Sequence, residues 1–431
     1  MRSKLFTLYT LSLAALTAGL LPAQETQSGG NPFAQAKFVP DISLILDASC
    51  IGRNHSDEAM ERLVLPGFTA PEGNDAAHAH GSSNGQRGFN LNYGELVISS
   101  IVDPFFDLFL VCDLGEESFA IEEAYFTTRR IPWGLQLKGG KFLSHFGRLN
   151  SMHTHQWDFV DAPLIYAGLF GESLLNEKGV RLTWVAPLET YFMLGGEFSQ
   201  GENSMSFGRD GFSAFDGQID VKGSDGPNLV VAYAKSSVDI GHLTLLGGLS
   251  MAHGKNRINH GIEEGEALAQ AGYGTTTITA VDLTLKYLFD SIRCLSLQAE
   301  YLHRNGAGDG WFIEPLAERL FVSAPYEQRQ GGFYAQMVGR LNKRVRMGGR
   351  FDRIMQNDGS RPGETASMPN HLTRYTAMAE YNPTEFSRLR LQYTHDRSLY
   401  EATAPGYIQK PANEIILQIN LAIGAHGAHA F

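Results

Sequence analysis

The feature that most constrains the fold of this chain is a regular series of segments in which apolar and polar residues alternate. In one segment, Val281, Leu283 and Leu285 share one face of a β-strand, and Asp282 and Thr284 share the other. Antiparallel sheets of soluble proteins also alternate, but their strands average about five or six residues, whereas these segments reach about ten or more. The pattern is typical of strands that cross a bilayer, with one face toward lipid and the other toward a polar interior.

The segments number about 16, an even count like that of single-chain bacterial barrels. We predict strands over 40–50, 88–101, 104–113, 117–128, 134–143, 178–187, 189–199, 227–237, 240–252, 275–289, 292–303, 329–340, 344–353, 371–382, 386–395 and 413–424. Short connections with Pro, Gly, Asn and Asp alternate with connections that are mostly long, as periplasmic turns alternate with extracellular loops. The sequence thus predicts an all-β fold, a transmembrane antiparallel β-barrel with both ends in the periplasm.

The N-terminus predicts export from the cytoplasm. Arg2 and Lys4 precede an apolar run over 5–21, and Pro22-Ala23 offers a small-residue cleavage site. A retained helical anchor is the alternative interpretation. We expect a signal peptide over 1–23, a periplasmic segment over 24–39 and the barrel over 40–431, placed in the cell outer membrane.

Charge and motifs narrow the classes of function. The formal net charge of −11 argues against nucleic acid as a partner. The sequence has no His-Glu-x-x-His and no phosphate-binding glycine-rich loop before a helix. We therefore predict that the protein is not an enzyme, and that its partners are outer-membrane lipid and small solutes or ions.

The long connection over 144–177 carries more charged, histidine and aromatic residues, taken together, than any other connection. Arg148, Asp158, Asp161 and Glu172 lie in it, with Trp157 and Phe159 between them. One interpretation is that these side chains set the width of a pore and the electric field within it. The alternative is a compact extracellular loop.

Arginines recur on two predicted strands and are candidates for lining the pore. Arg344, Arg346 and Arg350 share one face of 344–353, and Arg388 and Arg390 share one face of 386–395. An arginine that faces lipid at mid-bilayer costs about 2–4 kcal/mol, so we expect these side chains to face the lumen. The carboxylates of 144–177, on the opposite side of the pore, would then create an electric field across the lumen. Alternatively, Arg344 and Arg388 lie at the periplasmic rim and matter little.

Histidine pairs are candidate metal ligands. His78 and His80 form a His-Ala-His sequence, and His153 and His155 repeat the spacing. Neutral imidazole with a nearby carboxylate can bind zinc weakly, although neither pair has the spacing of a known zinc motif. The alternative is ordinary polarity of a solvated loop. Beyond such weak zinc binding, no cofactor is predicted.

Several motifs resemble a family of porin-like Gram-negative outer-membrane proteins. This family is often described as zinc-regulated and is distantly similar to phosphate-selective porins. The motifs are Ile121-Glu-Glu-Ala-Tyr-Phe-Thr127, Leu137-Lys-Gly-Gly-Lys-Phe142, Phe146-Gly-Arg-Leu-Asn150, His155-Gln-Trp-Asp-Phe-Val-Asp161 and Gly424-Ala-His-Gly-Ala-His429. The resemblance implies a porin whose third loop, 144–177, folds into the barrel as a constriction, and it implies a homotrimer, with a monomer left open. Family members are often richer in histidine in the first long loop, and this departure weakens a zinc role.

These observations predict passive diffusion of small hydrophilic solutes or ions through a narrowed lumen. The histidine pairs favour metal cations, zinc first, as cargo, whereas the arginines favour anions of the phosphate type. The alternative is a barrel that does not conduct and instead binds metal or another partner at the cell surface.

Overall fold

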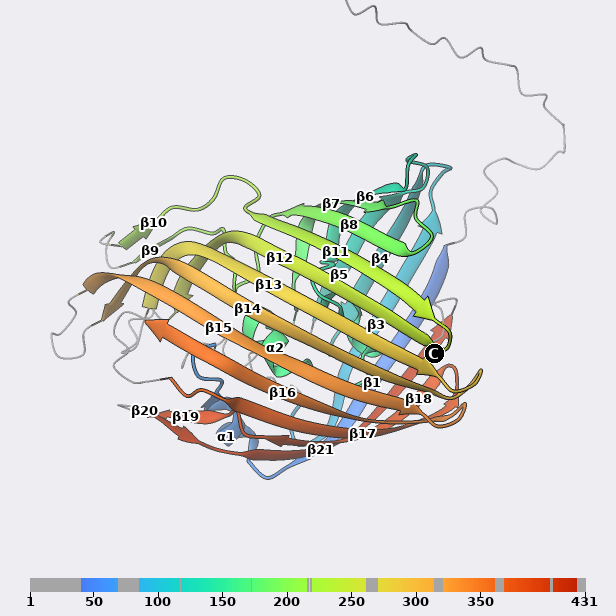
Figure 1. Cartoon of the computed structure of the whole chain (residues 1–431). Coiled ribbons are helices and arrows are strands. Elements are labelled where there is room, and N and C mark those ends of the chain that lie inside the picture. Colours follow the sequence, from blue (N-terminus) through green and yellow to red (C-terminus); the bar gives the residue numbers. More distant parts are fainter. Residues whose placement is uncertain are drawn as a thin grey trace, which may run out of the picture. The chain divides into compact units, whose positions relative to one another are not determined.

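Sixteen strands form a closed antiparallel barrel in the computed structural model, which describes residues 40–68, 85–116, 118–171, 173–214, 217, 219–260, 270–313, 321–360, 368–403 and 406–424 (Figure 1). They are β1 (Asp41–Arg53), β3 (Gly88–Ile101), β4 (Phe106–Leu114), β5 (Phe119–Thr128), β6 (Leu135–Leu143), β7 (Asn176–Val185), β8 (Tyr191–Ser199), β11 (Leu229–Ile240), β12 (Leu243–His260), β13 (Gln270–Leu288), β14 (Cys294–Ile313), β15 (Phe321–Arg340), β16 (Val345–Ser360), β17 (Leu372–Thr384), β18 (Ser387–Asp396) and β21 (Ala412–Gly424). They follow chain order around the barrel, and β1 closes it by pairing with both β3 and β21. The predicted transmembrane β-barrel is confirmed.

The two faces of each strand have opposite character. On β21, Ile415 and Leu417 expose 54% and 52% of their surface, whereas Gln418 and Asn420 are buried. The same alternation gives an apolar outer surface, and the inner wall is polar except where buried apolar residues such as Val231 and Ile278 line it. The apolar outer face suits contact with lipid, whereas the polar side chains of the inner face require a polar interior.

The short turns gather at one rim of the barrel. Ser43 pairs with Gly424, and Asp41 pairs with Ser99 close to the turn between β3 and β4. The first and last barrel strands therefore begin and end at the short-turn rim, as predicted.

The connections at the other rim carry further short elements. Among them are α1 (Asp57–Glu61), the sheet of β2 (Leu63–Val64), β19 (Tyr400–Thr403) and β20 (Gly406–Gln409), and the sheet of β9 (Phe212–Ala214) and β10 (Ile219–Val221). Among the described residues, no helix is long and apolar enough to cross a membrane.

Strands β12 to β16 extend well beyond their predicted ends. Residues 304–313 continue β14, although we expected a loop from 304 onward. The extension reads Asn305-Gly-Ala-Gly-Asp-Gly310 and pairs on both sides with β13 and β15. This glycine-rich extension has no apolar alternation, so the hydrophobic pattern could not reveal it. Backbone pairing holds it, together with side-chain contacts such as that between the rings of Tyr273 and Trp311.

Candidate functional site

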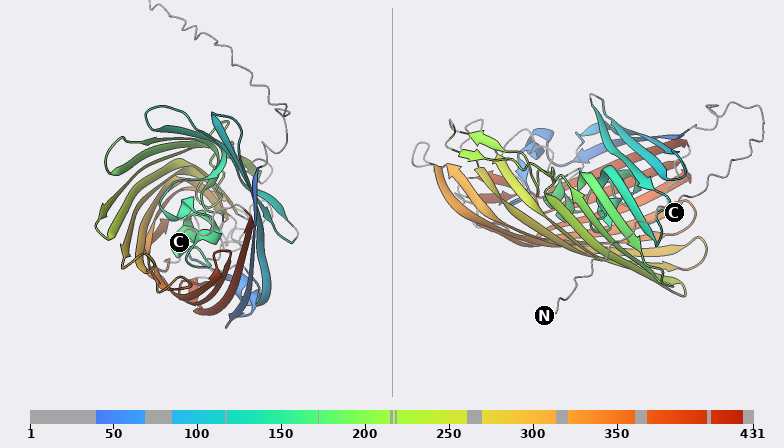
Figure 2. Two further views of the ribbon diagram at one scale, coloured as in Figure 1. Left: turned by 90° about the vertical axis from the view of Figure 1, so that its right-hand side faces the viewer. Right: turned by 90° about the horizontal axis from the view of Figure 1, so that it is seen from above.

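The connection between β6 and β7 lies inside the barrel, and we call residues 144–171 and 173–175 the inner loop. It contains η3 (Leu149–Ser151), η4 (Thr154–Gln156) and the short helix α2 (Leu164–Phe170). Every residue of α2 is buried. Figure 2 shows this helix within the ring of strands. The inner loop therefore occupies part of the lumen.

One part of the inner loop is apolar and packs on the inner wall. Tyr166, Leu169 and Phe170 belong to a buried cluster that also contains wall residues of β8 and of β11 to β17. The wall members are Met193, Leu229, Val231, Tyr233, Ala252, Ile278, Ala280, Leu302, Tyr334, Ile354 and Leu372. Close packing of this kind excludes water, so this side of the lumen is filled.

A carboxylate on β14 holds the start of the inner loop. Glu300 accepts hydrogen bonds from the backbone N–H groups of Arg148 (2.8 Å) and Leu149 (2.9 Å) and from the hydroxyl of Tyr166 (2.7 Å). Glu300 is 1% exposed. Buried charge is tolerated when it is hydrogen-bonded in this way, and the bonds fix η3 against the wall.

Aspartates of the inner loop meet arginines of the wall in what we call the arginine contact. Asp161 pairs with Arg350 (2.6 Å) and with Arg374 (2.8 Å), and Asp158 pairs with Arg346. Arg350 and Arg374 are 4% and 0% exposed. Charge pairs this deeply buried stay favourable only when their geometry is good and their other polar atoms are bonded.

The wall supplies further carboxylates to the same arginines. Ion pairs join Arg346 and Arg390 to Glu380, Arg350 to Asp352, and Arg374 to Asp396, at 3.1, 2.9, 2.9 and 2.8 Å. The arginines are thus neutralised by direct contact. This corrects the predicted transverse field: Asp158 and Asp161 do not face the arginines across an open pore, because the inner loop docks on the strands that carry them.

The other predicted pore residues have mixed locations. Arg388 is buried on the inner face of β18, and Arg148 is half-buried in the inner loop. Arg344 is exposed in the turn before β16, which begins at Val345, so it lies at the rim of the barrel. Glu172 lies outside the described residues.

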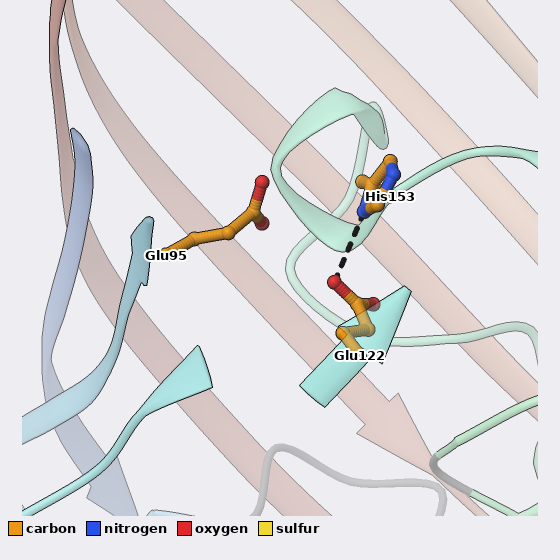
Figure 3. Close-up of side chains that lie close together, drawn as sticks. All are labelled: Glu95, Glu122 and His153. Carbon is orange, nitrogen blue, oxygen red and sulfur yellow. Dashed lines mark hydrogen bonds and ion pairs between the residues drawn. The ribbon is translucent and has the colours of Figure 1, made fainter. Parts of the chain in front are cut away.

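Histidines of the inner loop meet carboxylates of β3 and β5 in what we call the histidine contact. Figure 3 draws three of its residues, Glu95, Glu122 and His153. The two ring nitrogens of His153 lie 3.1 Å from Glu122 (Nδ1) and 2.9 Å from Glu123 (Nε2). Nδ1 of His155 lies 3.0 Å from Glu95. The two imidazole rings stack with their centroids 5.6 Å apart. The structure therefore brings His153 and His155 together, whereas His78 and His80 lie outside the described residues.

An irregularity in β5 creates the paired carboxylates of this contact. Val111 pairs with Glu123 but the next residue, Cys112, pairs with Ile121, so Glu122 is an extra residue in β5. In a regular strand, one of two neighbouring glutamates would face lipid. The bulge instead lets Glu122 and Glu123 both reach His153, and bulges often redirect side chains in this way beside functional sites.

The two histidines differ in charge. Burial by itself would lower the pKa of His153, but its hydrogen bonds to Glu122 and Glu123 raise it to about 11. At neutral pH both of its nitrogens therefore donate. Burial and the neighbouring charge of His153 lower the pKa of His155 to about 3. His155 is thus neutral, and it can serve as a hydrogen-bond partner without adding positive charge.

Three donor atoms of the histidine contact could share one cation. One ligand atom each from Glu95, Glu122 and His153 lies within 4.8 Å of the other two. Imidazole nitrogen and carboxylate oxygen are the donors that zinc and related divalent ions accept.

Comparison with known proteins places the chain in a family. An uncharacterized protein of Aquifex aeolicus (strain VF5) is 45% identical over 401 residues, which cover 93% of this chain and 82% of that protein. The chain belongs to the same family as this Aquifex protein. No protein-family model matches the chain.

Solved structures resemble the barrel at low sequence identity. The outer-membrane channel DcaP of Acinetobacter baumannii has a TM-score of 0.52 and 9% identity, with 90% of this chain and 99% of that chain covered. OmpT, an outer-membrane protein of Vibrio cholerae, has a TM-score of 0.49 and 9% identity, with 90% and 98% covered. The likeness to DcaP shows that the two proteins share a fold.

Several residues of these contacts were not among the predicted site residues. Glu95, Glu122 and Glu123 belong to the histidine contact, Arg374 belongs to the arginine contact, and Glu380 lies on the inner wall beside it. The adjacent glutamates within Ile121-Glu-Glu-Ala124 were a usable signal. Two successive charges interrupt a strand whose other residues alternate, and this is how a bulge shows in a sequence.

Proposed function

We propose that the protein is a passive outer-membrane channel for small hydrophilic solutes or ions, in which the inner loop forms the constriction. The observation that carries the proposal is a closed barrel with an apolar outer face and a charged loop held within it by ion pairs. An exported chain with a signal peptide over 1–23 fits this location. The homotrimer implied by the sequence resemblance stays part of the proposal.

Cations are the cargo that we propose, with zinc and other metal ions among them. Four wall arginines in ion pairs meet five carboxylates, namely Asp158, Asp161, Asp352, Glu380 and Asp396. These arginines therefore leave no surplus positive charge to favour anions. The histidine contact sets Glu95, Glu122 and Glu123 against one charged histidine, and negative charge in a pore lining favours cations.

A barrel that does not conduct is the second candidate. The observation that favours it is the apolar packing of α2 against β11 to β17, which fills one side of the lumen. Such a protein would bind a ligand at its loops without ion flow.

Single-channel recording of the refolded protein in a planar bilayer, under a salt gradient, separates the two candidates. Discrete ohmic steps with a reversal potential on the cation-selective side are expected. Replacing both Glu122 and Glu123 by Gln should move that reversal potential toward zero. A folded barrel without conductance steps would exclude the channel and leave the binding protein.

A further inference from the structure

The histidine contact has the arrangement of a metal site and not only of a set of ion pairs. We propose that Glu95, Glu122 and Nδ1 of His153 bind one divalent transition-metal ion of the zinc class. The ligands come from β3, from the bulge of β5 and from the inner loop. This site goes beyond the proposed channel, because it holds a resident ion whether or not the barrel conducts.

The distances suit an ion of this size. Zinc binds nitrogen and carboxylate oxygen at about 2.0–2.2 Å, so two donors on one ion lie roughly 3.4 Å apart. Nδ1 of His153 already lies 3.1 Å from Glu122, and the three ligand atoms lie within 4.8 Å of one another. Rotation of the glutamate side chains would close the remaining distance.

An independent observation points to metal binding: the second nitrogen of His153 is already oriented. Nε2 of His153 lies 2.9 Å from Glu123, which also accepts the backbone N–H of Leu143 at 2.7 Å. A histidine that ligates a metal almost always donates its other N–H to a carboxylate or carbonyl, which fixes the ring and increases its basicity. Glu123 provides that carboxylate here and is itself buried.

A second orienting contact acts on the ligand from β3. His155 donates from Nδ1 to Glu95 at 3.0 Å and stacks on the ring of His153. His155 is therefore a positioning residue and not a ligand. The predicted His-x-His pair would supply two nitrogens, but this site supplies one nitrogen and two carboxylates.

Binding exchanges a proton for the metal. Without metal, Nδ1–H of His153 donates to Glu122. When the divalent ion binds, Nδ1 releases this proton to solvent and its lone pair goes to the metal. Two carboxylates and a neutral imidazole then balance the charge of the ion, so no further reactant is needed.

Titration of the refolded full chain with Co²⁺, followed by visible absorption, tests the site. One equivalent should give a low-coordinate Co²⁺ spectrum that Zn²⁺ abolishes. His153→Gln and Glu122→Gln should each weaken this binding at least tenfold. The matched control His253→Gln removes an exposed histidine, bonded to Thr277, from β12 and should leave binding unchanged.

The nature of the ligands provides a second readout that needs no variant. X-ray absorption of the protein with one equivalent of Zn²⁺ should show one imidazole among mainly oxygen ligands. Two or more imidazoles would assign the ion to a histidine pair and overturn the proposal. Unchanged Co²⁺ affinity in folded Glu122→Gln would overturn it as well. Neither result depends on conductance, so failure of this site and failure of the channel are distinguishable.

Discussion

Two of the contacts between the inner loop and the barrel wall have opposite polarity, and they differ in more than sign. In the arginine contact, the loop supplies carboxylates and the wall supplies guanidinium groups with further carboxylates behind them. In the histidine contact, the loop supplies imidazoles and the wall supplies carboxylates. Arginine stays charged at every accessible pH and cannot bind a metal, whereas histidine can exchange its proton for one.

This difference suggests that the two contacts of the inner loop have different roles. Asp161 is bonded to two buried arginines and to Gln392, so the arginine contact is a permanent anchor. The histidine contact is partly exposed at Glu122 and has more carboxylates than cations. We expect the first contact to set stability and the second to respond to cations.

The largest effect is expected from breaking the anchor. Asp161→Asn leaves Arg350 and Arg374 buried without their shared counter-charge, and removing one partner of a buried ion pair costs about 3–5 kcal/mol. Equilibrium unfolding by urea in lipid vesicles measures this loss. Asp239→Asn, an exposed position at the end of β11, is the matched control and should change stability by less than about 0.5 kcal/mol. Equal stability of the two variants would show that the arginine contact is no anchor.

Zinc should stabilise the wild type by a somewhat smaller amount. A ligand that binds only the folded state at 100 times its Kd contributes about 2.7 kcal/mol. The same unfolding experiment with Zn²⁺ and with a chelator measures this difference. Glu122→Gln, with binding at least tenfold weaker, should lower the zinc effect by at least about 1.3 kcal/mol while leaving the anchor intact. An undiminished zinc effect in Glu122→Gln would place the ion elsewhere.

Removing the histidine of the second contact should cost less still in metal-free protein. The Gln amide can still donate to one of the two carboxylates, so His153→Gln loses roughly one charge-assisted hydrogen bond, and such a bond contributes about 1.5–3 kcal/mol. Unfolding in the presence of a chelator, with His253→Gln as the reference, measures the loss. A loss equal to that of Asp161→Asn would contradict the difference between the two contacts.

The smallest effect is expected at the exposed turn. Arg344→Gln alters no ion pair of the described inner wall, so unfolding free energy should change by less than about 0.5 kcal/mol. The reversal potential should also stay at its wild-type value. A clear shift of that potential would return Arg344 to the pore lining.

The sequence predicted the barrel well and its interior less well, for a physical reason. Alternation assigns a residue to the inner or outer face, and this was enough to find every barrel strand and to turn Arg350 and Arg390 inward. Alternation does not say which distant segment covers that face. The partners of Asp161 and the bulge at Glu122 depend on register and on the path of the inner loop. Both are properties of the closed barrel and not of any one strand.

The most direct test of the central claim, that a docked loop narrows a conducting barrel, is single-channel conductance of wild type beside Asp161→Asn in the same bilayer. The account predicts small ohmic steps for the wild type and larger, noisier steps for the variant, because the loop has lost its anchor. Identical steps would show that the inner loop does not limit flow, and folded but silent barrels in both cases would contradict the channel itself.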